Sequence, residues 1–364
     1  HHAKEIMRLR LGQGNRLPLP KRMVYTQPDL RLCHEPEPMS SADRTPETAT
    51  ADAPEQVADA VRGNWVDRRA PAWSRPYLRL SRADRPIGTW LLLLPCWWGV
   101  ALAAAQDGWR LRDVWIAGSC VVGAWLMRGA GCTWNDITDR DFDAAVARTR
   151  SRPIPSGQVS VRQAAAWMVL QALAAAGILF SYNGAAILLG LASLALVAVY
   201  PFAKRFTWWP QVFLGLAFNW GALLAYAAHA GRPDLPALLL YASGIAWTLF
   251  YDTIYAHQDK EDDALIGVKS TARLFGAATP QWLGLFLVAS VLLMSAAILT
   301  ALLPEAHPLK LAVALAAPWA FGWHLWWQTR QVDTDDPESC LHVFRSNRDA
   351  GLVAALFLAI AAFL

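Results

Sequence analysis

Long apolar runs separated by short polar breaks are the feature that most constrains the fold of this 364-residue chain. Apolar residues make up 55% of the sequence and charged residues only 17%, against about a quarter in typical soluble proteins. Because a helix of about 20 residues crosses a bilayer, the runs predict an all-α, polytopic membrane protein with nine transmembrane helices. The predicted spans are residues 87–105, 113–133, 162–181, 184–202, 211–229, 236–255, 281–303, 309–328 and 349–364, with an earlier start around Leu341 as the alternative for the last.

The N-terminal region differs from the rest in composition. Residues 1–38 are basic and contain several prolines, and the stretch that follows Met39 is rich in Ala, Thr, Pro and acidic residues. Such sequence lacks the apolar side chains needed for a core. We therefore expect residues 1–70 to be a disordered, tag or targeting tail, with Met39 as a candidate natural start, and residues 71–364 to be the transmembrane domain.

Lys and Arg are concentrated before the first predicted span and in alternate breaks after it. Because basic loops stay on the cytoplasmic side, this asymmetry predicts a cytoplasmic N-terminus. The composition after Met39 favours a bacterial inner membrane, with the mitochondrial inner membrane as the alternative. The net charge of +4 is explained by topology and indicates no nucleic-acid partner, and the five cysteines form no CxxC pair. The sequence leaves the oligomeric state open.

The first of two acidic stretches runs from Asn135 to Gly157, directly after an apolar run. On a helix, Asn135, Asp139 and Asp143 would line one stripe, with Asp136 beside it. Closely packed carboxylates repel one another, so a bound cation is expected. A solvated loop with ordinary salt bridges is the alternative reading.

The second acidic stretch runs from Tyr251 to Arg273 and also leaves an apolar run. Asp252, Asp259 and Asp263 recur at i, i+7 and i+11, which again predicts one helical stripe. The loop topology places both stretches on the same, cytoplasmic side, where two facing rows of oxygen ligands would suit Mg²⁺.

Basic residues accompany both acidic stretches. They would not hold a metal, but they would neutralise a bound polyanion, so acids and bases together predict a diphosphate site. Since the remainder of the chain is apolar, an isoprenoid diphosphate fits, with its tail among the helices. The departing diphosphate would leave an allyl cation, which Trp134, Tyr251 and Tyr255 are placed to shield if they are not ordinary packing residues. The basic residues are Arg140, Arg148, Arg152, Lys204, Arg205, Lys260, Lys269 and Arg273.

Both stretches carry longer motifs. The first reads as NDxxDxxxD from Asn135 to Asp143, continued by VxRTxxRPxPSG from Val146 to Gly157. The second reads as DxxYAxxDxxxD from Asp252 to Asp263, followed by GVKSTA. With these motifs the chain, over about residues 75–364, resembles the UbiA superfamily of intramembrane prenyltransferases. Three shorter matches resemble the branch that prenylates 4-hydroxybenzoate: Arg85–Trp90, Tyr200–Arg205 and Phe344–Asn347.

The resemblance implies a nine-helix fold around a central cavity capped by cytoplasmic loops. It implies transfer of a polyprenyl group from polyprenyl diphosphate to the 3-position of 4-hydroxybenzoate, within ubiquinone biosynthesis, with Mg²⁺ as cofactor. It also implies that Asn135 assists five metal-binding aspartates and that Tyr200, Lys204 and Arg205 lie near the substrates. Arg85 is our candidate for the acceptor carboxylate, with a snorkelling interfacial side chain as its alternative. The five aspartates are Asp136, Asp139, Asp143, Asp259 and Asp263.

Other functions remain open at the level of sequence. The same chemistry on homogentisate, a naphthoate or haem differs only in the acceptor. A cation channel or transporter with an aspartate-lined vestibule would need polar residues continuing through the spans, which the sequence lacks. A CDP-alcohol phosphatidyltransferase would need an Asp-Gly and Ala-Arg motif that neither acidic stretch supplies. Prenyl chain length is not readable from generic apolar side chains.

Overall fold

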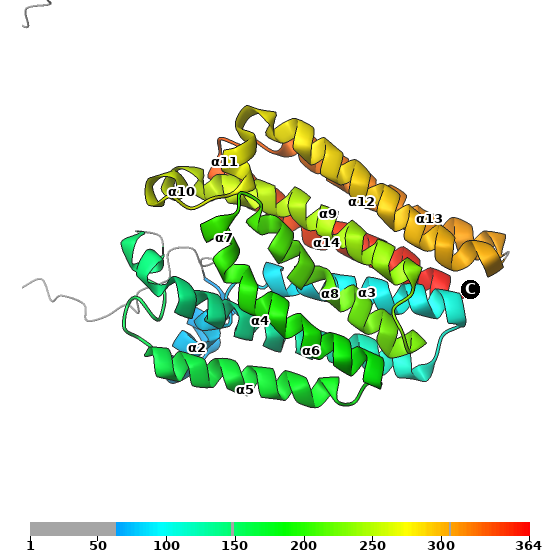
Figure 1. The fold of residues 1–364 in the computed structure, drawn as a ribbon, viewed down its shortest axis with the longest axis horizontal. Helices are drawn as coiled ribbons and strands as arrows, with labels where there is room; N and C mark the ends of the chain where they lie inside the picture. The colour runs from blue at the N-terminus through cyan, green and yellow to red at the C-terminus, as the bar shows by residue number, and fades with distance from the viewer. Residues whose placement is uncertain (1–62, 147–148, 306) are drawn as a thin grey trace, which may run out of the picture. The chain divides into compact units, whose positions relative to one another are not determined.

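The computed structural model describes residues 63–146, 149–305 and 307–364, and within these ranges the chain forms helices and no β-strand. Nine long helices follow one another at the places predicted from the apolar runs (Figure 1), which confirms the all-α prediction. They are α3 (Ile87–Asp107), α4 (Leu111–Ala145), α5 (Val161–Leu179), α6 (Gly184–Val199), α8 (Pro210–Ala230), α9 (Leu235–Ala256), α12 (Thr279–Leu302), α13 (Pro308–Gln331) and α14 (Pro337–Ala362).

Seven helical stretches in the described part of the chain are long and apolar enough to cross a membrane. The helices α13 and α14 are as long but are not among these seven. The seven are α3, α4, α5, α8 and the stretches Gly184–Phe206, Leu235–Asp259 and Thr271–Leu302.

The last helix begins twelve residues earlier than the predicted span, at Pro337 rather than at residue 349. Asp336 caps this helix, because its carboxylate accepts from the backbone N–H groups of Glu338 (3.0 Å) and Ser339 (3.2 Å). Pro337 occupies the first helical position, where its missing N–H costs no hydrogen bond. The final helix therefore has 26 residues and is not a short span.

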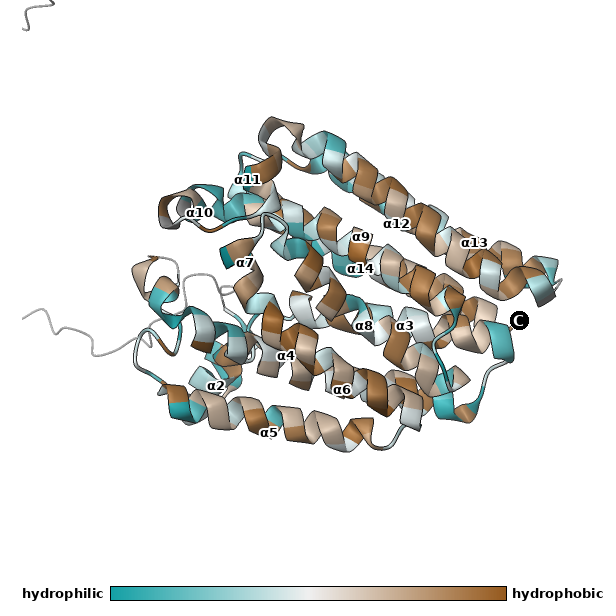
Figure 2. Cartoon of the chain, in the orientation of Figure 1, coloured by the Kyte–Doolittle hydropathy of each residue, from teal (hydrophilic) through white to brown (hydrophobic). Residues whose placement is uncertain are grey.

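Short helices connect the long ones, and Figure 2 shows hydrophilic residues gathered at several of them, notably α2, α7 and α10. Among the predicted site residues, these connections contain Lys204, Arg205, Asp259 and Asp263. The connections are α1 (Trp65–Arg69), α2 (Arg75–Leu80), α7 (Ala203–Phe206), α10 (Lys260–Ile266), α11 (Thr271–Phe275) and the 3₁₀ turns Ala72–Ser74, Tyr200–Phe202, His257–Asp259, Gly276–Ala278 and Leu303–Glu305.

Residues 63–70 belong to the folded part of the chain, although the sequence assigned them to the tail. Val66 is fully buried, and the Trp65 indole N–H donates to the carbonyl of Ala83 at 2.9 Å. The remaining tail, residues 1–62, lies outside the described residues.

The core is built from small residues and aromatic rings. Gly99 lets α3 approach α8 closely, since a Cβ at this position would meet the carbonyl oxygen of Ala222 at 2.3 Å. The rings of Trp98, Trp247 and Phe321 pack against one another with centroids 4.9–5.7 Å apart and join α3, α9 and α13. This packing fixes the helices from which the polar connections extend.

Candidate functional site

Three aspartates form a buried stripe on the last turns of α4. The helix stays continuous to Ala145, so Asp136, Asp139 and Asp143 fall at i, i+3 and i+7 on one face. They are only 0%, 1% and 7% exposed. The predicted stripe of Asn135, Asp139 and Asp143 is therefore wrong only in its first member, because Asp136 is buried on this face while Asn135 is half-buried.

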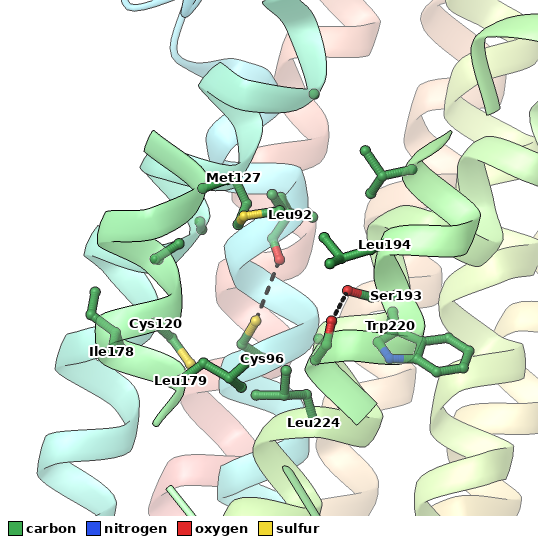
Figure 3. Close-up of a pocket in the computed structure, with 18 of the residues that line it drawn as sticks. Leu92, Cys96, Cys120, Met127, Ile178, Leu179, Ser193, Leu194, Trp220 and Leu224 are labelled. Carbon is green, nitrogen blue, oxygen red and sulfur yellow. Dashed lines mark hydrogen bonds between the residues drawn. The ribbon is translucent and has the colours of Figure 1, made fainter. Parts of the chain in front are cut away.

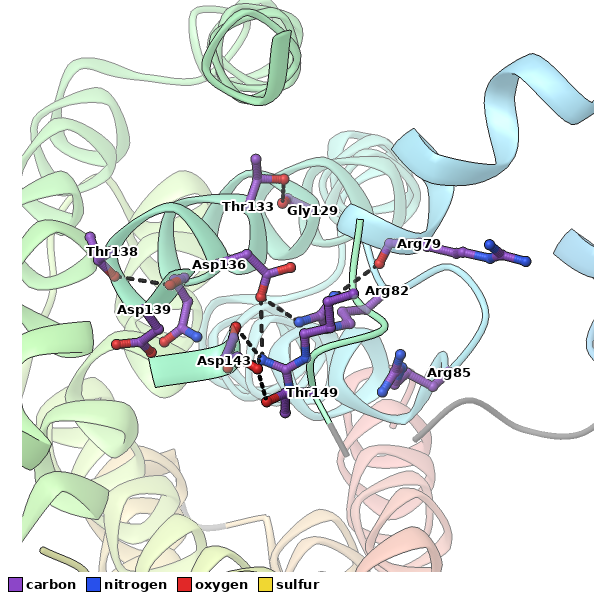
Figure 4. A network of polar contacts seen from close by, with 12 residues as sticks. Arg79, Arg82, Arg85, Gly129, Thr133, Asp136, Thr138, Asp139, Asp143 and Thr149 are labelled. Atoms are coloured by element: carbon purple, nitrogen blue, oxygen red, sulfur yellow. Dashed lines mark hydrogen bonds and ion pairs between the residues drawn. The ribbon is translucent and has the colours of Figure 1, made fainter. Parts of the chain in front are cut away.

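Asp136 is paired with cations from two other segments (Figure 4). Its Oδ1 atom lies 2.5 Å from a guanidinium nitrogen of Arg82 and 3.6 Å from one of Arg152. Its Oδ2 atom is buried, and no described residue donates a hydrogen bond to it. A buried carboxylate oxygen without a donor is costly unless a cation or donor from outside the chain reaches it.

Asp143 is held by the loop that follows α4. Both of its carboxylate oxygens accept from Arg152, at 3.0 and 2.9 Å, and its backbone carbonyl accepts from the Thr149 hydroxyl at 2.9 Å. The Arg140 side chain faces solvent, with its Nε atom 3.5 Å from Asp141 Oδ1. It therefore does not contact the buried aspartates, although it was predicted to bind substrate. Arg148 lies outside the described residues.

Asp139 is paired with the short helix α7, which follows the fourth long helix. The Lys204 ammonium lies 2.5 Å from Oδ2, and a guanidinium nitrogen of Arg205 lies 3.4 Å from Oδ1. The carbonyl of Lys204 accepts from the backbone N–H of Lys269 at 3.3 Å. Lys204 therefore joins the first acidic motif to the loop after the second, and the two loops meet at one end of the helices as predicted.

The second acidic motif does not form one helical stripe. The helix α9 ends at Ala256, a 3₁₀ turn covers His257–Asp259, and α10 starts at Lys260. Asp252, Asp259 and Asp263 therefore lie on three different elements and are half-buried. The break arises at Asp259, whose φ of −110° and ψ of 7° leave the helical region.

Other predicted residues lie around these motifs. The Lys269 ammonium sits over the Trp208 ring at 5.9 Å and donates to the carbonyl of Phe206 at 3.4 Å. Tyr255 packs on Phe344, with ring centroids 4.5 Å apart, so α14 supports this part of the site. Arg85 makes an ion pair with its neighbour Asp84 at 3.1 Å.

The donor set of the first motif fits Mg²⁺ in chemistry, since it offers three carboxylates and one buried oxygen without a donor. Within the described residues, however, no three His, Cys, Asp or Glu side chains lie close enough together to hold a metal ion. Each aspartate of the first motif is instead paired with Arg or Lys. The five predicted metal ligands are therefore not gathered into one cluster in this conformation.

A largely apolar cavity of about 360 Å³ extends between α3, α4, α5, α6 and α8 (Figure 3). Tyr200, which lines it, stands four residues before the Lys204 that binds Asp139. From there the cavity continues along α4 past Met127 and Gly123 to Ser119. The cavity is thus a long apolar space with one end beside the charged site.

Arg128 is a functional candidate that the sequence analysis missed. It is the single charged side chain among the described residues that line the cavity. Its guanidinium lies 5.2 Å from the centroid of the Phe218 ring, and its buried Nε has no acceptor among the described residues. An arginine inside an apolar span was the available signal, because charges in membrane helices are usually functional.

Comparison with known proteins identifies close relatives. A sequence model described as the UbiA prenyltransferase family matches residues 92–362. The Bos taurus protein named 4-hydroxybenzoate polyprenyltransferase, mitochondrial, is 50% identical over 292 residues, which are 80% of this chain and 76% of the relative. The Homo sapiens protein of the same name is 47% identical over 288 residues, 79% of this chain and 75% of the relative.

Solved structures share the fold. A UbiA homolog from Archaeoglobus fulgidus bound to DMAPP and Mg²⁺ superimposes with a TM-score of 0.58 at 19% identity, covering 79% of this chain and 98% of that chain. The apo structure of a UbiA homolog from Aeropyrum pernix K1 gives a TM-score of 0.57 at 22% identity, covering 74% and 97%. The architecture predicted from the motifs is therefore confirmed.

Proposed function

Because the chain belongs to the UbiA prenyltransferase family, we propose that it transfers a polyprenyl group from polyprenyl diphosphate to the 3-position of 4-hydroxybenzoate. The product, 3-polyprenyl-4-hydroxybenzoate, would serve ubiquinone biosynthesis. The observation that carries the proposal is the row of three buried aspartates at the end of a long apolar cavity. An enzyme that joins a hydrocarbon tail to a charged head needs both.

The donor diphosphate binds at the charged end. Lys204, Arg205 and Arg152 already pair with the aspartates there, so they are placed to transfer their hydrogen bonds to phosphate oxygens. Asp136, Asp139 and Asp143 would hold Mg²⁺, with Asp259 and Asp263 contributing from the second motif. When bound, the metal supplies positive charge for the departing diphosphate.

The donor tail lies in the apolar cavity. The cavity starts at Tyr200, near the Lys204–Asp139 ion pair, and is lined by leucine, alanine and glycine along α5 and α6. Some lining residues, such as Leu173 (66% exposed) and Leu194 (47% exposed), also face the surroundings of the helices. A long tail can therefore extend from the cavity into lipid.

The acceptor carboxylate binds Arg128 in this proposal. A benzoate needs a buried cation at the cavity wall, and the Arg128 Nε has no described acceptor of its own. Arg85, the candidate from sequence, remains a prediction, but it is already paired with Asp84. The Phe218 ring beneath the guanidinium helps to hold it in place.

The reaction exchanges a carbon–oxygen bond for a carbon–carbon bond. The C1–O bond of the donor breaks, the electron pair leaves with the diphosphate, and the electron-rich ring carbon ortho to the acceptor hydroxyl attacks C1. The ring then loses the proton from that carbon. Tyr251 and Tyr255, whose aromatic faces pack beside Trp247 and Phe344, are candidates for shielding the allyl cation.

The names of the relatives bear on the membrane in which the protein acts. The Bos taurus and Homo sapiens relatives carry the word mitochondrial in their names, which supports the mitochondrial inner membrane over the bacterial inner membrane. In either membrane the positive-inside rule places the charged site on the cytoplasmic or matrix side.

Prenyl transfer tests the proposal directly. Membranes containing the protein are incubated with radiolabelled 4-hydroxybenzoate, a polyprenyl diphosphate and Mg²⁺, with or without EDTA. We expect a lipid-soluble labelled product that disappears when EDTA removes the metal. If product forms only with homogentisate or only with a naphthoate, the assigned acceptor is wrong and the chemistry stands. If no acceptor is prenylated, the proposed activity is contradicted.

A further inference from the structure

Arg82 has a backbone conformation that arginine rarely adopts. Its φ is +55°, and it is the single non-glycine residue with positive φ in the described part of the chain. The left-handed region is unfavourable for a residue with a Cβ, so such a residue persists only where its surroundings fix it. The position of the arginine therefore calls for a reason beyond the turn itself.

The turn around Arg82 is fixed from two sides. The Ser81 hydroxyl donates to the Gln171 side chain on α5 at 2.9 Å and accepts from the Trp167 indole at the same distance. On the other side, Trp65 binds the carbonyl of Ala83. These anchors hold the backbone so that the arginine side chain points at α4.

The side chain of Arg82 reaches one particular oxygen. One guanidinium nitrogen donates to the carbonyl of Arg79 at 3.0 Å, and another lies 2.5 Å from Asp136 Oδ1. Both side chains are almost fully buried, with 8% and 0% exposure. The contact is short, charge-assisted and protected from water.

We propose that Arg82 is a positioning residue that occupies Asp136 until the donor diphosphate arrives. This inference rests on the proposed function, because it assigns Asp136 to Mg²⁺. While the guanidinium neutralises Asp136, Mg²⁺ alone competes poorly for that carboxylate. A diphosphate offers the guanidinium a new partner, so Asp136 becomes available to the metal when both ligands are present.

Replacing Arg82 should therefore change two binding affinities in opposite directions. Removing the guanidinium leaves the Asp136 carboxylate less neutralised, with Arg152 at 3.6 Å as its other cation, which favours Mg²⁺ alone. It also removes a cation for the diphosphate, which disfavours Mg²⁺ bound together with diphosphate. A residue with a merely structural role would weaken both events.

Titration calorimetry on the purified full chain tests this inference, with Mg²⁺ alone and with Mg²⁺ plus inorganic pyrophosphate. Arg82→Gly keeps the left-handed backbone, and Arg82→Asn is the second variant if the first does not fold. We expect Mg²⁺ alone to bind either variant about tenfold more tightly, and pyrophosphate with Mg²⁺ about tenfold more weakly. Arg79→Gln is the matched control, because Arg79 is buried in the same segment but pairs with Asp67.

Three outcomes would contradict the inference. Unchanged or weaker binding of Mg²⁺ alone to both Arg82 variants would exclude the competition for Asp136. The same tightening in Arg79→Gln would assign the effect to the segment as a whole. If the unchanged chain binds no Mg²⁺ even with pyrophosphate, the metal assignment in the proposed function fails as well. The first two outcomes would contradict the role of Arg82 but not the metal assignment.

Discussion

Aspartates only a few residues apart on α4 have different environments. The Asp136 side chain is fully buried and meets two arginines, whereas the Asp141 side chain is 85% exposed and lies 3.5 Å from Arg140. Charge by itself therefore does not mark the site. Burial next to cations from other segments does, because burying a carboxylate is costly unless its partners are supplied.

Asp136→Asn should lower kcat/KM for prenyl transfer on the order of 100-fold, because the neutral amide binds a cation poorly. Asp141→Asn, the matched control, should stay within about twofold of the unchanged enzyme, since an exposed ion pair contributes little. Steady-state assays on both purified variants check this. Similar activities in the two variants would remove Asp136 from the metal and diphosphate site.

Arg128→Gln should raise the KM for 4-hydroxybenzoate roughly 10- to 100-fold and change the donor KM little, since a hydrogen bond to a charged group is worth about 1.5–3 kcal/mol. Arg85→Gln serves as the comparison and should have the smaller effect, because Arg85 is paired with Asp84. Initial rates at varied acceptor and donor give both constants. The reverse order of the two effects would return the acceptor to Arg85.

At the scale of elements, two glycines of α4 differ in their position relative to the cavity. Gly123 lines the cavity and Gly118 does not, yet a Cβ at either position meets no atom within 4 Å. Gly123→Leu should therefore be accommodated while it narrows the space for the tail. We expect a raised KM for long-chain donors and a small change for a short one, with Gly118→Leu as control. Equal effects on short and long donors would place the tail elsewhere.

The last helix is attached through a buried amide. The Asn347 side chain is fully buried, accepts from the Trp247 indole at 2.8 Å and donates to Gln328 at 3.0 Å. Asn347→Ala would leave both partners unsatisfied and should cost about 1–3 kcal/mol of stability. Ser346→Ala should cost far less, since the Ser346 hydroxyl donates to the carbonyl of Val343 within its own helix. Thermal unfolding in detergent measures both, and equal melting temperatures would contradict this role.

These elements also show what the sequence could predict. Apolar runs placed the nine long helices because membrane helices are set by length and hydrophobicity. The row on α4 was nearly right, because that helix is continuous. The second row was wrong, since helical spacing was assumed across a break at Asp259. The start of α14 was placed too late, at residue 349 or around Leu341, because its first turns are polar, although Asp336 and Pro337 are ordinary helix-start signals.

The site as a whole depends on partners that spacing does not reveal. Arg82 and Asp136 are 54 residues apart, and Lys204 and Asp139 are 65 apart. Such pairs follow from how the helices pack, which local patterns do not specify. Lys204 was predicted as one of the basic residues that would neutralise a diphosphate, and its motif also resembles a known family. Arg82 and Arg128 were not singled out, and only the packed structure shows that they face the aspartates and the cavity.

Orientation in the membrane is the remaining property of the whole molecule. Asp141 lies at the charged end of the helices. Arg232 lies at the other end, because α8 runs 21 residues, about 30 Å, from near Lys204 to the turn before α9. Both side chains are exposed, at 85% and 78%. The positive-inside rule therefore predicts that a reagent unable to cross the membrane meets them from opposite sides.

Single cysteines test this orientation. The four cysteines in the described residues are buried, so a chain with Cys33→Ser has low background labelling. In sealed vesicles with the cytoplasmic or matrix side outward, a charged maleimide should label Asp141→Cys and spare Arg232→Cys. Detergent should expose both positions, which controls for reactivity. Labelling of Arg232→Cys but not of Asp141→Cys would contradict the predicted topology. It would place the diphosphate site on the side opposite to the one that the basic loops predict.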